Sequence, residues 1–326
     1  MPERRGVRVA DAGSGLPPGG PGCVVTVGTF DGVHVGHHDV LARLTARARE
    51  TGLRSLVVTF DPHPSDVVKP DRAPLLLTTV EEKLEALAAC GVDYCAVVPF
   101  TRTLAEFTAE DFVFQVLRPR FAMRALVIGF DHGFGRDRAG SVEMLARLGA
   151  AEGFSVDVVP AVELEGGARV SSTSVRQAVT EGDLERAARE LGRPYSVSGT
   201  VSHGDKRGRL LGFPTLNIAR PSARKLLPPA GVYAVRVQTP AGSFGGMMNL
   251  GPRPTFGDSA LSLEVHLFDV QAELYGATVR LDFLARLRET RAFPSAEALV
   301  AQLREDASQA RRALSAAPAA MSLRGG

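Results

Sequence analysis

The sequence predicts an α/β domain with a parallel sheet, followed by a small antiparallel β-barrel with a C-terminal helix. The chain has 326 residues, which is enough for two separate cores. Up to residue 191, apolar strand-like runs alternate with helical periodicity, as a parallel sheet requires. From residue 192, strand-like runs follow one another across turns. We therefore expect a disordered leader (1–22), an α/β domain (23–191), a barrel domain (192–314) and a tail (315–326).

The composition excludes several classes of protein. With 38 Lys and Arg against 36 Asp and Glu, a broad nucleic-acid-binding surface is not expected. No apolar run reaches transmembrane length, and the start lacks a signal-peptide pattern, so we expect no membrane partner. The three cysteines form no CxxC pair, which argues against zinc and disulfides and predicts a cytoplasmic protein. The sequence leaves the oligomeric state open, a homo-oligomer being one alternative.

Two histidines lie where the first predicted strand passes into a helix. The apolar run 24–27 is typical of a buried strand, and the turn 28–32 (GTFDG) ends it. His34 and His37 are three residues apart and share one face of the helix that follows. A helix start offers free N–H groups to a phosphate, and Gly36 lets that phosphate approach the backbone. The pattern therefore favours a triphosphate site in which both histidines stabilise developing charge.

Taken alone, this HxGH motif fits two surface polar residues on a tight turn equally well. A metal site at the same place is disfavoured, because no Cys or carboxylate stands nearby at ligand spacing. The choice between these interpretations depends on the rest of the chain.

The remaining elements of the α/β domain follow in regular alternation. His63 stands between two prolines, which we expect to prevent either a strand or a helix from continuing and to hold His63 on a rigid loop at a strand's carboxyl end. A stiff turn without function is the alternative. The strands are predicted at 54–60, 94–98, 125–130 and 154–159, and the helices at 80–89, 107–117, 141–151 and 180–191.

Two further segments carry groups that suit phosphate. The loop 131–140 (DHGFGRDRAG) joins glycines to Arg136 and Arg138, which suit a nucleotide or flavin phosphate. The stretch 170–176 (VSSTSVR) places hydroxyls and Arg176 at a helix start. Helix capping alone would explain those hydroxyls, and it remains the simpler interpretation of this segment by itself.

In combination, GTFDGVHVGH, TFDPHP, IGFDHGFG and VSSTSVR resemble the FMN adenylyltransferase module of bacterial bifunctional riboflavin kinase/FAD synthetases. The resemblance implies a Rossmann-like nucleotidyltransferase domain of the HxGH type. It also implies catalytic roles for His34, His37 and Arg176. By the same resemblance, the ATP site would include Gly28, Phe30, Asp31, Gly36, Ser172 and Thr173, and the flavin contacts would include His63, Asp131 and Phe134.

In the barrel domain, the glycine-rich basic loop 202–209 would suit phosphates, although a solvated hairpin tip is the ordinary alternative. Thr215 and Asn217 are two residues apart, so both side chains point to one side of an extended segment. Their uncharged oxygens suit Mg²⁺ beside ATP phosphates, although both residue types also occur in ordinary turns. Strands are predicted at 195–201, 232–238, 243–249, 261–268 and 278–284, and the terminal helix at 295–314.

The strand 261–268 (LSLEVHLF) alternates, so Glu264 faces away from the apolar side formed by Leu263 and Val265. A carboxylate at that position would suit a general base. A solvent-facing strand residue without function is the more ordinary interpretation.

This half resembles riboflavin kinase through GTVSHGDKRGRLLGFPTLNI, MNLGPRPTF and LEVHLFDVQAELYG. The resemblance implies that Thr215 and Asn217 bind MgATP and that Glu264 is the base for the riboflavin 5′-hydroxyl. It places Gly204 and Gly208 in a flap over the nucleotide and Arg253 in a loop that closes on flavin.

Together the two resemblances predict an enzyme that converts riboflavin to FMN and then FMN to FAD, using ATP and Mg²⁺. Two alternatives remain open at this point. One is a regulator that binds flavin nucleotides without turnover. The other is a nucleotidyltransferase for another phosphorylated vitamin, with the barrel as an accessory.

Overall fold

The computed structural model describes residues 7–11, 13, 15–16, 19–130, 135, 140–160, 169–203, 208, 211–252, 261–270 and 273–317. The chain forms two compact units. Of the described residues, the first unit contains those up to Leu75 together with those between Val80 and Ser171, and the second contains Leu76–Thr79 and those from Ser172 to Ala317.

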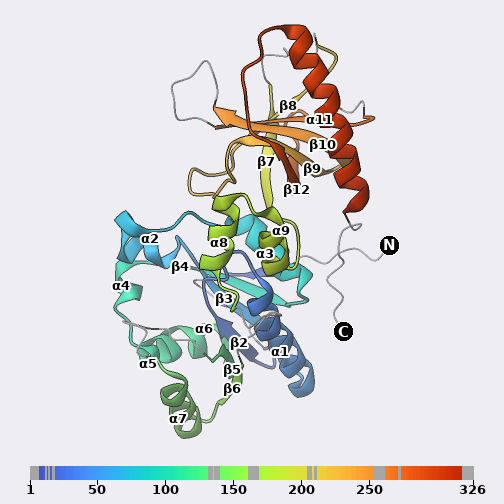
Figure 1. Cartoon of the computed structure of the whole chain (residues 1–326). Helices are drawn as coiled ribbons and strands as arrows, with labels where there is room; N and C mark the ends of the chain where they lie inside the picture. Colours follow the sequence, from blue (N-terminus) through green and yellow to red (C-terminus); the bar gives the residue numbers. More distant parts are fainter. Residues whose placement is uncertain are drawn as a thin grey trace. The chain divides into compact units, whose positions relative to one another are not determined.

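The first unit is built on a six-stranded parallel sheet (Figure 1). Its strand order is β1-β4-β3-β2-β5-β6, and every pairing is parallel. The chain runs outward from β2 to β3 and β4, then returns to the other side of β2 through β5. This reversal makes the carboxyl end of β2 the point where ligands gather in such sheets. The strands are β1 (Arg8–Ala10), β2 (Cys23–Val27), β3 (Arg54–Asp61), β4 (Tyr94–Pro99), β5 (Met123–Gly129) and β6 (Ser155–Val159).

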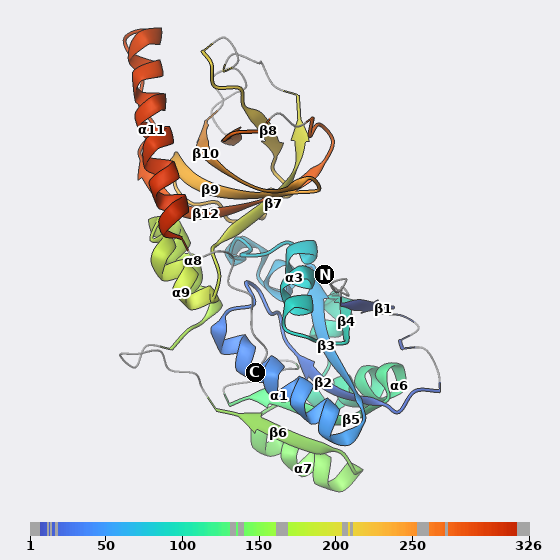
Figure 2. The ribbon, with the colours of Figure 1, turned by 90° about the vertical axis from the view of Figure 1, so that its right-hand side faces the viewer.

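Helices cover both faces of this sheet, as the predicted α/β fold requires (Figures 1 and 2). Val24 and Val57 belong to a core shared with Leu41 of α1 and Leu87 of α3. The alternate strand residues pack on the opposite face in a second core with α5 to α7. The helices are α1 (Val35–Thr51), α2 (Pro64–Val68), α3 (Val80–Ala89), α4 (Arg102–Ala105), α5 (Ala109–Phe112), α6 (Arg118–Phe121) and α7 (Val142–Glu152), with a 3₁₀ turn at Pro70–Arg72 and a π-helical turn at Val113–Leu117.

Two local expectations were wrong. Arg8–Ala10, placed in a disordered leader, forms edge strand β1 beside β4, where the Arg8 guanidinium donates to the Tyr94 hydroxyl at 2.7 Å. Pro64 does not forbid a helix but begins α2. The first helical position needs no N–H donor and suits the fixed φ of proline.

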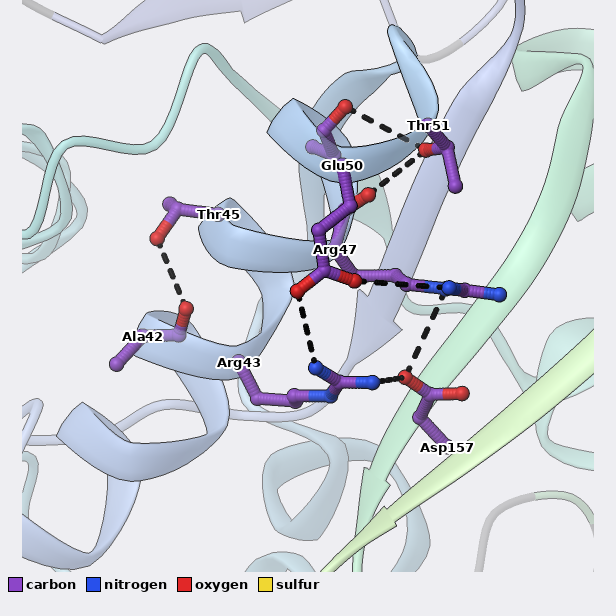
Figure 3. A network of polar contacts seen from close by, with 8 residues as sticks. Ala42, Arg43, Thr45, Arg47, Glu50, Thr51 and Asp157 are labelled. Atoms are coloured by element: carbon purple, nitrogen blue, oxygen red, sulfur yellow. Dashed lines mark hydrogen bonds and ion pairs between the residues drawn. The ribbon is translucent and has the colours of Figure 1, made fainter.

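An ion cluster joins α1 to edge strand β6 (Figure 3). Asp157 of β6 lies 2.6 Å from a guanidinium nitrogen of Arg43 and 3.8 Å from the Nε of Arg47. Glu50 lies within 3.6 Å of both arginines. The side chains of the two arginines are 30% and 41% exposed, so each pair contributes at most about 1 kcal/mol.

The second unit is a closed antiparallel barrel with strand order β10-β11-β8-β7-β12-β9, in agreement with the prediction. Helix α11 packs along its outer surface through Ala310, which contacts the core of Ala234, Met247 and Phe268 (Figure 2). The elements of this unit are α8 (Ser172–Glu181), α9 (Leu184–Leu191), β7 (Ser196–Ser202), β8 (Leu216–Ala219), β9 (Gly231–Thr239), β10 (Gly242–Pro252), β11 (Leu261–Leu267), β12 (Thr278–Arg288) and α11 (Ala296–Ala316).

The predicted domain limits differ from the compact units in detail. Helices α8 and α9 group with the barrel, whereas we placed the boundary between residues 191 and 192. Ser295 caps α11, accepting from the Ala298 N–H at 3.2 Å, but the helix continues to Ala316 inside the predicted tail. The boundary at 191/192 stays a prediction about independent folding.

A buried ion pair fixes α11 to the barrel. The carboxylate of Asp306 is fully buried and accepts three hydrogen bonds from the Arg288 guanidinium at 2.7 to 3.1 Å. The Gln302 amide donates to the same carboxylate at 2.8 Å.

We predict that Asp306→Asn destabilises the barrel unit by about 3 kcal/mol, because the partly buried Arg288 loses its counter-charge. Denaturant unfolding of the intact chain would measure the change. Arg189→Ala, which removes the exposed pair with Glu185, is the matched control and should change stability by less than about 1 kcal/mol. Equal effects of the two substitutions would contradict the prediction.

Candidate active sites

The turn between β2 and α1 has an unusual backbone. Phe30 has φ 46° and Val33 has φ 42°, a left-handed conformation that costs a non-glycine residue roughly 1–3 kcal/mol. Both side chains are buried, and Asp31 between them is only 1% exposed. The turn is therefore a packed structure and not a solvated loop.

His34 and His37 come together at the start of α1, as predicted. Their rings stack with centroids 3.7 Å apart, and the Phe30 ring lies 5.0 Å from that of His37. The His34 backbone N–H donates to His37 Nδ1 at 3.3 Å. Because Nδ1 accepts, a neutral His37 carries its proton on Nε2. That nitrogen can then donate to a phosphate oxygen at the helix N-terminus.

Glycines leave room around these rings. A Cβ added at Gly36 would lie 3.2 Å from His34 Nδ1 and 3.5 Å from the Val170 carbonyl oxygen. A Cβ added at Gly28 would lie 3.1 Å from the Phe30 ring. Any side chain at either position would push a ring of the site, which explains why glycine suits both.

The predicted flavin contacts of the first unit are only partly described. His63 caps α2, where its Nδ1 accepts from the Ser65 N–H at 3.2 Å. Its position at the carboxyl end of β3 agrees with the prediction, but its contact with flavin stays a prediction. Asp131 and Phe134 lie outside the described residues.

Ser172, Thr173 and Arg176 lie in the first turns of α8, which belongs to the second compact unit. Thr173 is exposed, while Ser172 and Arg176 are half-buried. Their neighbour Ser174 donates to the buried Glu190 of α9 at 2.7 Å, which orients the start of α8. Their role as a second phosphate-binding motif stays a prediction.

In the barrel, strand register brings the predicted kinase residues together. Glu264 of β11 pairs directly with Asn217 of β8 on one side and with Asn249 of β10 on the other. Ser202 of β7 pairs with Asn217. Directly opposed residues on adjacent strands point to the same face, with Cβ atoms about 4.5–5.5 Å apart. The four side chains therefore form one polar row across four strands.

This row lies on the outer face of the barrel. The neighbours of Glu264 along β11, Leu263 and Val265, are at most 1% exposed and fill the interior. Glu264 itself is half-buried, and Asn217 is 9% exposed. The predicted alternation along 261–268 is thus confirmed at its centre.

The segment before β8 is held against β11. His266 Nδ1 lies 2.8 Å from the Pro214 carbonyl oxygen, to which it must donate. Gly208 accepts at its carbonyl from the N–H of Phe213 at 2.8 Å. A Cβ at Gly208 would lie 2.3 Å from the Phe213 carbonyl oxygen and 3.5 Å from Thr215 Oγ1. Only glycine fits so close an approach, as a flap over nucleotide phosphates would require.

Two of the predicted barrel residues, Gly204 and Arg253, lie outside the described residues. Within the described part of the chain, no group of three or more His, Cys, Asp or Glu is placed to hold a metal ion. The hydroxyl of Thr215 and the amide oxygen of Asn217 are hard, uncharged ligands. They suit a Mg²⁺ ion that takes its remaining ligands from phosphate and water.

Sequence reasoning missed two residues of these surroundings, Asn249 and Lys83. Asn249 completes the polar row, and only its alternation on β10 could have indicated this. Lys83 of α3 is 6% exposed and donates to the Thr59 hydroxyl at 3.2 Å. Lys83 lies four residues before buried Leu87, and this helical spacing was the available signal.

Comparison with known proteins agrees with these two sites. A family model described as FAD synthetase matches residues 18–174, and one described as riboflavin kinase matches residues 191–314. The chain is 40% identical over 294 residues to the bifunctional riboflavin kinase/FMN adenylyltransferase of Escherichia coli K12, covering 89% of this chain and 92% of that protein. The chain belongs to this bifunctional family. The resemblance noted in both halves of the sequence is thereby confirmed.

Other relatives extend the same match. The bifunctional riboflavin kinase/FMN adenylyltransferase of Pseudomonas fluorescens is 41% identical over 297 residues, covering 91% of this chain and 94% of the relative. A crystal structure described as a macrolide-efflux protein from Streptococcus pneumoniae superposes with a TM-score of 0.83 at 32% identity, over 94% of this chain and 99% of that one. Among the described helices, none has the length and apolar character needed to span a bilayer.

Burial controls the chemistry of two cysteines in the α/β unit of this family member. It raises the pKa of the Cys23 thiol to about 12, against the opposing charge of Arg54. It also raises the pKa of the Cys95 thiol to about 12, against the opposing charge of Lys83. Both groups therefore stay protonated thiols throughout the neutral range.

We predict that only Cys90, which is half-buried, reacts rapidly with a thiol reagent at pH 8. With a pKa near 12, about one in 10⁴ of the Cys23 and Cys95 groups is thiolate at that pH, and burial restricts access further. Absorbance titration with a disulfide reagent would count the reactive groups. All three should react in denaturant, and rapid reaction of more than one in the native protein would contradict the prediction.

Proposed function

We propose that the chain catalyses two successive reactions, the phosphorylation of riboflavin to FMN and the adenylylation of FMN to FAD. The observation that carries this proposal is the polar row of the barrel. It sets Glu264 opposite Asn217 within the segment that matches riboflavin kinase, while the histidine turn lies within the segment that matches FAD synthetase. The segment that matches each of the two families thus carries its own candidate site.

In the kinase reaction, the riboflavin 5′-oxygen attacks the γ-phosphorus of ATP while its proton passes to the Glu264 carboxylate. The bond from that phosphorus to the β,γ-bridging oxygen breaks, and ADP leaves. Positioning supplies most of the rate, because phosphoryl transfer needs no covalent bond to the protein. Thr215 and Asn217 would hold Mg²⁺, which supplies positive charge to the phosphate oxygens when bound.

In the adenylyl transfer, a phosphate oxygen of FMN attacks the α-phosphorus of a second ATP. The bond to the α,β-bridging oxygen breaks, and pyrophosphate leaves. The Nε2–H of His37 and the N–H groups at the start of α1 donate to the phosphates. Arg176 and the hydroxyls of Ser172 and Thr173 would neutralise further charge, and His63 would contact the flavin.

The partners in this proposal are small molecules, with no nucleic acid. Cys23, Cys90 and Cys95 are free thiols, which supports the cytoplasm as the compartment.

Glu264→Gln should reduce FMN formation from riboflavin by roughly 10²–10⁴-fold, because an amide of the same shape cannot accept the hydroxyl proton. Chromatographic separation of riboflavin, FMN and FAD would measure it. The variant should still convert supplied FMN to FAD at the wild-type rate.

The matched control is Glu289→Gln, which alters a carboxylate that is 84% exposed on the same unit, and it should leave both activities unchanged. Normal kinase turnover in Glu264→Gln would remove the base role. If the wild-type chain forms neither FMN nor FAD from riboflavin, ATP and Mg²⁺, the proposed function itself is wrong.

His37→Asn should show the reverse pattern. The Asn side-chain oxygen can still accept from the His34 N–H, so α1 stays capped, but the Nε2 donor is gone. We expect FAD formation from FMN to fall by roughly 10²–10³-fold, while FMN formation from riboflavin stays normal in the same preparation. Product analysis with each flavin in turn provides the measurement, and undiminished FAD formation would exclude His37 from the site.

A further inference from the structure

Lys83 is a charged side chain inside the α/β core. It lies on α3, is 6% exposed, and faces β3, where Thr59 is fully buried. Burial lowers the pKa of the Lys83 ammonium, and the carboxylates of Asp31 and Asp61 oppose that shift. Burial of an ammonium is costly unless it is paired and hydrogen-bonded, so a lysine here requires an explanation.

Two successive hydrogen bonds connect Lys83 to the turn between β2 and α1. Its Nζ lies 3.2 Å from Thr59 Oγ1, and Thr59 Oγ1 lies 3.0 Å from the Thr29 carbonyl oxygen. An ammonium only donates, so the Thr59 hydroxyl accepts from Lys83 and must give its single proton to Thr29. Lys83 is thus connected through one side chain to the backbone of the turn between β2 and α1.

The connection ends on the strained part of that turn. Thr29 precedes Phe30, whose φ is 46°, and Val33 follows with φ 42°. Asp31, which lies between these two residues, is 1% exposed, and its charge opposes the effect of burial on the Lys83 pKa.

We propose that Lys83 is a positioning residue for adenylyl transfer. Through Thr59, its ammonium holds the Thr29 carbonyl, so that the strained turn presents His34 and His37 to the nucleotide. Lys83 itself touches neither substrate. This inference rests on the proposed FMN adenylylation and assigns the charge that preorganises its site.

The test is Lys83→Met in the full-length chain. Methionine is close in length and apolar, so the cavity stays filled while the charge and the donor are lost. We expect kcat for FAD formation from FMN to fall by roughly 10²-fold, the cost of a displacement of about 1 Å in a positioned site. FMN formation from riboflavin, measured in the same preparation, should change by less than about two-fold.

Lys69→Met is the matched control, because it removes an exposed lysine from the same unit and should leave both activities unchanged. Thr59→Val and Thr59→Ser form a second, independent pair. Valine keeps the shape of threonine without the hydroxyl and should lower kcat for FAD formation, while serine keeps the hydroxyl and should restore most of it. Lys83→Met and Thr59→Val should be non-additive, since both break one connection.

The outcomes separate the hypotheses. Wild-type FAD formation in Lys83→Met, or equal activity of Thr59→Val and Thr59→Ser, would overturn the inference while leaving the proposed function intact. An equal fall in both activities of Lys83→Met would indicate a general loss of folding and would also overturn it. If Lys83→Met is insoluble, the two Thr59 variants decide the question. Absence of FAD formation by the wild-type chain would instead reject the proposed function.

Discussion

The first unit depends on a turn that the backbone alone would not favour. Between β2 and α1, Phe30 and Val33 adopt left-handed conformations that together cost several kcal/mol. Burial of their side chains offsets that cost, since each fully buried apolar side chain contributes roughly 1.5–3 kcal/mol. The Thr59 hydroxyl adds a polar connection to this turn, because it donates to the Thr29 carbonyl oxygen at 3.0 Å. The stacked histidines at the start of α1 follow this turn directly, so the turn sets their position.

In the second unit, the pairing of strands positions the side chains of the candidate site. Its polar row follows from the antiparallel pairing of β8 with β11, which sets Asn217 opposite Glu264. A closed barrel has no free edge, so the register cannot slip by one residue without moving Leu263 and Val265 out of the core. The hydrophobic interior therefore fixes the positions of groups on the outer face. Site geometry here results from sheet register and not from a special turn.

One site depends on a local turn and the other on strand register, and this difference explains how far the sequence could predict each of them. Local periodicity was sufficient for the strand and helix alternation, for the shared face of His34 and His37, and for the outward direction of Glu264. It could not supply the pairing of Asn217 with Glu264, because register between distant strands depends on the whole barrel. It also missed Lys83, since a lysine at a helical position is ordinarily assigned to the surface. Edge strand β1 was not predicted, because a strand of three residues is too short to show a recognisable alternation of apolar and polar residues.

Both proposed reactions transfer phosphorus without a covalent enzyme intermediate, so the protein must act through fixed charge and position. Flexible side chains would stabilise the transition state less, because they would have to rearrange as its charge develops. In the barrel, the positions are fixed by strand pairing, which resists small displacements. In the α/β unit, they are fixed by the turn that Lys83 holds from inside the core. A single buried substitution should therefore impair adenylyl transfer at a distance, whereas the kinase site should be sensitive mainly to residues of its own row.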